Sequence, residues 1–203
     1  MTRRSTLAWF AFSVVAASLM TSAVAQQHQM LGLSDEDIIK SVRFAAPRAI
    51  VDHSTIVSMS DEGSLRIIRQ GSNNYTCMAE VPLRGAEPMC ADQNGLKWMQ
   101  ALITRKIPPA DAVGLIYMLS GTADASFTDP FAQRPAPTDT WVVTGPHIMI
   151  VGEGSLMDGY PRGPKPDVSQ SYVMWAGTPY EHLMIPMPMV DYRALSAQVL
   201  PGN

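Results

Sequence analysis

The stretch AIVDHSTIVSMSDEGSLRIIRQGSNNYTCMAEV, residues 49–81, decides the fold class because its apolar residues recur with a period of two. Three alternating runs, 49–59, 65–70 and 75–81, are separated by the polar segments DEGS and GSNN. Alternation of this kind is typical of strands with one buried face, and a glycine in each polar segment suits a tight turn. The pattern predicts a three-stranded antiparallel meander.

Two helices are expected beside these strands. Residues 35–45 follow Ser34, a favoured N-cap, and begin with three acidic residues that suit the positive end of a helix dipole. Pro47 marks the end of this helix. Residues 92–104 place apolar side chains at helical spacing behind Asp92, which is a second candidate cap.

The second half of the chain combines short apolar runs with long polar connections. Strands are expected within 113–119, 140–151, 172–177 and 182–185, the second of them interrupted at Gly145-Pro146. The connection of about twenty residues before the third run is unusually long for a compact domain. Together with the first half, this predicts a single α+β domain over residues 26–203, with a mainly antiparallel sheet and long loops.

The first 25 residues have the pattern of an export signal. Arg3 and Arg4 precede the uncharged apolar run 7–20, and Ala23 and Ala25 are the small residues that signal peptidase requires. The apolar run is shorter than the roughly 20 residues that span a bilayer. The sequence therefore predicts cleavage after Ala25 and a periplasmic or secreted location, by either the general secretory or the twin-arginine route.

Composition limits the partners of the exported part. The whole chain has a net charge of -3, its basic residues are scattered, and no Lys/Arg run is present. A nucleic-acid partner is not expected, because such partners select clustered positive charge. No second long apolar stretch follows the signal, so we expect no transmembrane segment in the mature chain. A small ligand or an envelope partner fits this composition, and the oligomeric state is not predicted.

Cys77 and Cys90 are the only cysteines, and both lie in the exported part. In an oxidising compartment such a pair most simply forms one disulfide, which closes a small loop. The CxxC spacing that favours a redox or metal-thiolate pair is absent.

The chain lacks the short motifs of common catalytic sites, including HExxH, SxxK, GxSxG and the phosphate-binding P-loop. A dispersed hydrolase site stays open as a hypothesis, since catalytic triads are defined in space rather than in sequence. In that hypothesis His147 or His182 is the base, and Ser155, Glu153 or Asp158 approaches it from the long loop.

Several segments carry a resemblance: SNNYTCMAEVP, MCADQNGLKWM, FTDPFA, TGPHIMI and YVMWAGTPYEHLMIPM. They resemble segments of a family of uncharacterised exported bacterial proteins, over most of the mature chain. The resemblance implies a setting in the bacterial envelope and carries no activity.

A copper site is a further hypothesis, based on the H-x-M pattern shared by His147-Ile148-Met149 and His182-Leu183-Met184. Thioethers select Cu(I) and imidazole binds either copper state. Residues two apart on a strand share a face, so each pair presents one imidazole and one thioether together. Two such strands side by side would assemble four ligands: His147, Met149, His182 and Met184.

Strand parity divides the methionines of this region. Leu183, Ile185, Met187 and Met189 fall on one face, which is expected to be core, whereas His182 and Met184 fall on the other. Methionine is also a common filler of cores, so Met187 and Met189 are interpreted as structural. Three functions remain open: a non-catalytic binding module, which is favoured, a copper-binding protein, and a hydrolase.

Overall fold

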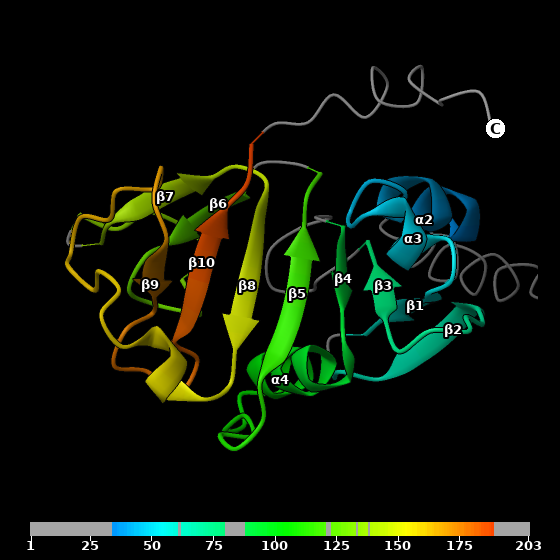
Figure 1. Cartoon of the computed structure of the whole chain (residues 1–203), viewed down its shortest axis with the longest axis horizontal. Helices are drawn as coiled ribbons and strands as arrows, with labels where there is room; N and C mark the ends of the chain where they lie inside the picture. The colour runs from blue at the N-terminus through cyan, green and yellow to red at the C-terminus, as the bar shows by residue number, and fades with distance from the viewer. Residues whose placement is uncertain are drawn as a thin grey trace, which may run out of the picture. The chain divides into compact units, whose positions relative to one another are not determined.

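A computed structural model describes residues 34–60, 62–79, 88–120, 123–132, 134–137 and 139–188. The expected signal peptide, its cleavage site and Met189 lie outside these residues. In the described part, eight strands form one sheet in the order β2-β1-β3-β4-β5-β8-β10-β9, and β6 and β7 form a second, small sheet (Figure 1). The elements in chain order are α2 (Asp35–Val42), α3 (Arg48–Val51), β1 (Thr55–Met59), β2 (Leu65–Arg69), β3 (Thr76–Met78), β4 (Met89–Ala91), α4 (Gln93–Ile103), β5 (Gly114–Met118), β6 (Ala123–Ser126), β7 (Trp141–Thr144), β8 (His147–Val151), η1 (Gly154–Met157), β9 (Tyr172–Met174) and β10 (His182–Pro186). The predicted α+β class with a mainly antiparallel sheet is confirmed.

The three strands at the start of the chain do not form the predicted meander. β1 lies between the other two, pairing antiparallel with β2 and parallel with β3. The segment after β2 folds across the start of β1, where the amides of Ser72 and Asn73 both donate to His53 O. Gly71 permits this crossing, because a Cβ there would collide with the backbone of Ser54 and Thr55. β3 therefore enters on the far side of β1.

The start of the first predicted strand is helical instead. Residues 48–51 form the single turn α3, in which the amides of Ile50 and Val51 donate to Pro47 O. Proline suits a helix start because its fixed φ is compatible with the first turn. α4 is present as predicted, and the Asp92 carboxylate accepts from the amide of Gly95 at 2.7 Å.

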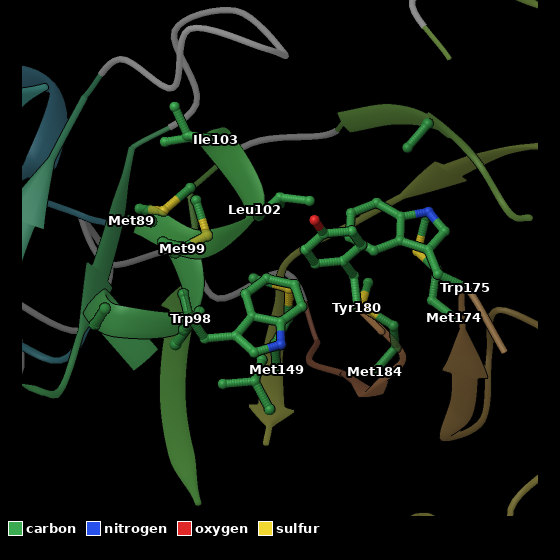
Figure 2. Packing of buried hydrophobic residues seen from close by; sticks show 14 of the residues in the cluster. Met89, Trp98, Met99, Leu102, Ile103, Met149, Met174, Trp175, Tyr180 and Met184 are labelled. Atoms are coloured by element: carbon green, nitrogen blue, oxygen red, sulfur yellow. The ribbon is translucent and has the colours of Figure 1, made fainter. Parts of the chain in front are cut away.

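The large sheet has a core face and a back face. On the core face, Ile116, Met149 and Met184 pack with Trp98 and other side chains of α4 and with the small sheet (Figure 2). This cluster contains most of the buried methionines of the described residues.

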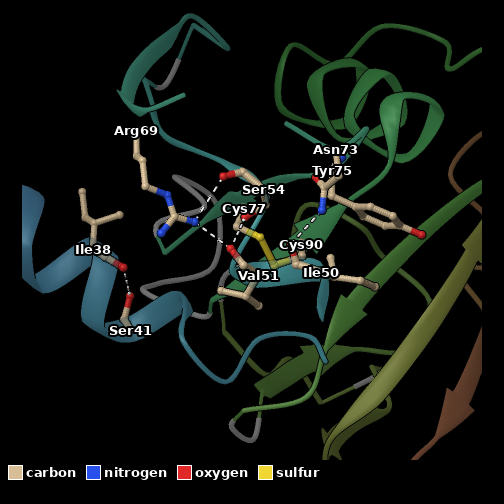
Figure 3. The surroundings of a disulfide bond; sticks show 10 residues. All are labelled: Ile38, Ser41, Ile50, Val51, Ser54, Arg69, Asn73, Tyr75, Cys77 and Cys90. Carbon is tan, nitrogen blue, oxygen red and sulfur yellow. Dashed lines mark hydrogen bonds between the residues drawn. A yellow bond between two sulfur atoms is a disulfide. The ribbon is translucent and has the colours of Figure 1, made fainter. Parts of the chain in front are cut away.

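The back face is covered at its two ends by separate small clusters. At one end, side chains of α2 and α3 pack with Ile56 and with the disulfide between Cys77 and Cys90, which lie directly opposite each other on β3 and β4 (Figure 3). At the other end, Met157 of η1 packs on Val173 and Leu183. None of the described helices is long and apolar enough to cross a membrane.

Candidate ligand-binding pocket

The two H-x-M strands are neighbours, as the copper hypothesis requires, but their histidines are far apart. β8 and β10 pair antiparallel, with His147 opposite Pro186 and His182 opposite Val151. The two histidines are four residue steps apart along the ladder, a distance of about 13 Å. Both side chains lie on the core face, since directly opposite residues share a face. A common coordination shell needs bonds of about 2 Å, so this register does not bring the four residues of the copper hypothesis into one site.

The methionines of the two patterns lie between the histidines. Met149 and Met184 are directly opposite each other, and they are 7% and 2% exposed within the main core. Met184 and Leu183 lie on different faces of β10, as strand parity predicts. The expectation that the face of Met187, and not that of Met184, forms the core is wrong, because Met184 is buried in the main core and Met187 is half-buried. The reason is that both faces of β10 are covered. Within the described ranges, no three His, Cys, Asp or Glu side chains gather to hold a metal ion.

His182 belongs to an aromatic cluster. Its ring lies edge-on to Trp175 and Trp98, with ring centroids 4.7 Å and 5.3 Å away, and its Nδ1 lies 3.0 Å from Tyr180 O. The side chain is 1% exposed. Its surroundings are those of a packed core residue.

The acid-base candidates of the hydrolase hypothesis are separated from both histidines by the sheet. Ser155 and Glu153 are joined by a 2.8 Å hydrogen bond at η1, which covers the back face, whereas His147 and His182 lie on the core face. Asp158 is exposed and lies 3.9 Å from Arg162. The structure brings none of these three residues to a histidine.

His147 instead opens onto a pocket at one end of β8 and β10. The pocket has a volume of about 460 Å³. Its walls come from the β7–β8 turn, the end of β10 and the segment before β9, and they consist of Thr144, Gly145, Pro146, His147, Val168, Ser169, Tyr172, Met184, Pro186, Met187 and Pro188. Of the predicted ligand residues, His147 and Met184 are in this wall.

Local hydrogen bonds hold two of these walls in place. The amide of Met187 donates to Pro146 O at 2.8 Å, which fixes the end of β10 beside the β7–β8 turn. On the other side, Asp167 accepts from the Ser169 hydroxyl and from Gln170 Nε2, both at 2.6 Å. These bonds lower the pKa of Asp167, so its carboxylate stays charged and keeps the loop ordered.

His147 presents a hydrogen-bond acceptor to the pocket. Its Nδ1 lies 2.7 Å from Gly145 O, and because a carbonyl oxygen only accepts, Nδ1 carries the proton. Burial lowers the pKa of His147, so the ring is neutral at neutral pH. In this tautomer Nε2 carries the lone pair.

Tyr172 presents a hydroxyl group to the same pocket. Burial raises its pKa to about 12, so the phenol keeps its proton. Tyr172 Oη and His147 Nε2 have no hydrogen-bond partner among the described residues. In that part of the chain, Ser120 Oγ is the one fully buried polar side-chain atom without a partner. The two groups are therefore accessible, and since their residues are only 2% and 6% exposed, we assign that access to the pocket both residues line.

The sequence predicts His147 and Met184 as candidate site residues, but it does not predict the other residues of the pocket wall. The sequence pattern places Tyr172 at the start of a strand and gives it no role in a site. The available signal was the placement of prolines at 146, 186 and 188 beside the two H-x-M strands, since prolines end strands and leave irregular backbone there.

The protein is thus an α+β domain with an uncharged pocket at one end of β8 and β10. No protein-family model matches the chain, and no curated protein or solved structure matches it either. The proposed function therefore rests on the pocket.

Proposed function

We propose that this protein is an exported, non-catalytic module that binds a small ligand in the pocket around His147. The observation that carries the proposal is the pair of polar groups, His147 Nε2 and Tyr172 Oη, which belong to buried residues of a mainly apolar cavity wall and have no protein partner. Because both groups are accessible and have no protein partner, each is available to hydrogen-bond a ligand, and small-molecule sites are mainly apolar with a few such groups.

The size and lining of the cavity support the same function. A volume of about 460 Å³ lies within the range of small-molecule sites, which are mainly apolar with a few placed polar groups. Three prolines, two methionines and Val168 supply the apolar part. Hydrogen bonds at Pro146 and Asp167 fix the walls, so the site is formed before a ligand enters.

The surroundings of His147 favour binding over catalysis. A general base is usually oriented by a carboxylate and placed beside a nucleophile. Here Nδ1 is bonded to the backbone of Gly145, and the Ser155 and Glu153 pair lies on the other face of the sheet. Export is supported by the disulfide of Cys77 and Cys90, because such bonds persist in oxidising compartments.

The test is a fragment screen by saturation-transfer NMR on the purified protein, with neutral, anionic and cationic aromatic fragments. We expect at least one fragment to bind, and its signal to disappear in Val168→Trp. Val168 is 40% exposed in the pocket wall, so a larger side chain fills the cavity without entering the core.

The matched control is Val113→Trp. Val113 is 43% exposed and lies outside the pocket wall, before β5, so this variant should bind as the wild type does. Failure of every fragment to bind, or equal loss of binding in both variants, would overturn the proposed function.

A further inference from the structure

The ligand class follows from the charge, polarity and shape of the pocket walls, given the proposed function. None of the eleven lining residues carries a formal charge when the His147 ring is neutral. An ion that entered such a cavity would lose part of its hydration and find no counter-charge in the walls, which is unfavourable. The pocket therefore selects against charged ligands.

The two unpaired polar groups differ in their roles. His147 Nε2 accepts a hydrogen bond, because the ring proton is held at Nδ1 by Gly145 O. The protonated hydroxyl of Tyr172 is a donor. A ligand that leaves either group unpaired forfeits a hydrogen bond, so a complementary ligand brings one donor and one acceptor.

The strand register sets where the two polar groups stand. Tyr172 on β9 is opposite Met184, and His147 on β8 is opposite Pro186, so β10 lies between them. Strands two places apart are separated by about 10 Å, and the two positions are also offset by two residues along β10, which is about 7 Å. The ligand thus lies across β10, and its donor and acceptor are at opposite edges rather than adjacent.

The apolar walls are suited to a flat ring. Pro146, Pro186 and Pro188 present rigid hydrocarbon surfaces, and the thioethers of Met184 and Met187 lie in the same wall. Methionine sulfur makes favourable contacts with aromatic rings and adapts to their outline.

We infer that the pocket binds a neutral, planar ring ligand that donates a hydrogen bond to His147 Nε2 and accepts one from Tyr172 Oη at its opposite edge. This inference rests on the proposed function and adds the ligand's charge, shape and polarity to it.

The experiment measures affinities by isothermal titration calorimetry with three probes of similar size. 4-Quinolone is neutral and planar, with an N–H donor and a carbonyl acceptor on opposite sides of one ring. 1-Methyl-4-quinolone lacks the donor, and 1-naphthoate is an anion. We expect 4-quinolone to bind at least about tenfold more tightly than the other two probes. The methyl derivative loses one hydrogen bond, and 1-naphthoate brings an uncompensated charge.

Two variants assign the polar contacts. Tyr172→Phe removes only a hydroxyl that has no protein partner, so it should leave the melting temperature unchanged. It should lower the affinity for 4-quinolone about tenfold. His147→Leu should bring 4-quinolone and its methyl derivative to equal affinity. Because Tyr172→Phe keeps the fold, it gives an answer even if His147→Leu is unstable.

The outcomes separate the two proposals. Binding of 1-naphthoate as tightly as 4-quinolone, or a Tyr172→Phe variant with unchanged affinity, overturns the inference about the ligand class. The inference is also overturned if 4-quinolone does not bind but a different fragment binds the wild type and not Val168→Trp. That outcome leaves the proposed function standing. If no fragment binds at all, both fall.

Discussion

His147 and His182 lie on the same face of the sheet at opposite ends of the β8–β10 ladder. Their surroundings differ accordingly: His147 lines a pocket, and His182 is enclosed by Trp98 and Trp175. The shared H-x-M pattern thus contributes one side chain to a binding site and one to the core.

Met184 should matter for stability far more than Met187. Met184 is 2% exposed in the main core, so Met184→Ala should lower the free energy of unfolding by about 2–5 kcal/mol. Met187 is half-buried beyond the end of β10, and Met187→Ala should cost less than about 1 kcal/mol. Urea unfolding of the two variants checks the order, and a larger cost at Met187 would show that the register of β10 is misassigned.

His147 should make the protein less stable in mild acid. Its pKa is lowered in the folded state by burial, so between that value and its ordinary value of 6.5 the unfolded chain binds more protons than the folded one. Stability should therefore be unaffected by His147 above pH 7 and fall with decreasing pH below about 6.5, by at most about 1.4 kcal/mol per pH unit.

The comparison is with His147→Gln, which carries no titrating ring. Denaturation between pH 7.5 and 5 should show a steeper loss in the wild type than in this variant. Parallel curves would mean that His147 titrates alike in both states and is not buried.

Reduction of the Cys77–Cys90 disulfide should destabilise the domain. The bond joins β3 to β4 beneath α2 and α3, and closing a loop of this length contributes about 3 kcal/mol. For a domain of this size, that corresponds to a drop in melting temperature of about 6–12 °C. Calorimetry with and without reductant measures the drop, and thiol alkylation of the untreated native protein should give no product.

Ser126 should be a stability-determining polar residue. Its buried hydroxyl accepts from the amides of Thr128 and Asp129 and donates to the Asp139 carboxylate at 2.7 Å. Ser126→Ala leaves the two amides without this acceptor, whereas Asp139 still accepts from Thr128 Oγ1, and the substitution should cost about 1–3 kcal/mol. Ser155→Ala, at an exposed serine, is the control and should change stability by less than about 0.5 kcal/mol. Equal effects of the two substitutions would contradict the assigned role of Ser126.

Local sequence patterns predict the positions of most helices and strands, but they do not predict which strands pair. Period-two alternation located β1, β2, β3, β8 and β10, and the cap at Asp92 located α4. The parallel pairing of β1 with β3 depends on the crossing at Gly71, which is a tertiary contact without a local signal. The short elements β4, β6 and η1 were missed because three or four residues carry too little periodicity.

The site was predictable only in part, for a related reason. Parity placed His147 and Met184 on one face correctly, but it does not say which face is buried when both are covered. Tyr172 comes from a strand two places away from His147, and no spacing in the sequence relates the two. The sheet order, which only the structure gives, brings both to one pocket.

The most direct test of the pocket is an NMR titration of the protein, labelled at its methionine methyl groups, with 4-quinolone. Met184 and Met187 line the pocket, whereas Met89 and Met157 lie in other parts of the core. We expect saturable shifts of the Met184 and Met187 methyl signals, with those of Met89 and Met157 unmoved. Shifts confined to Met89 or Met157, or no shift at Met184 and Met187 at millimolar 4-quinolone, would contradict this expectation.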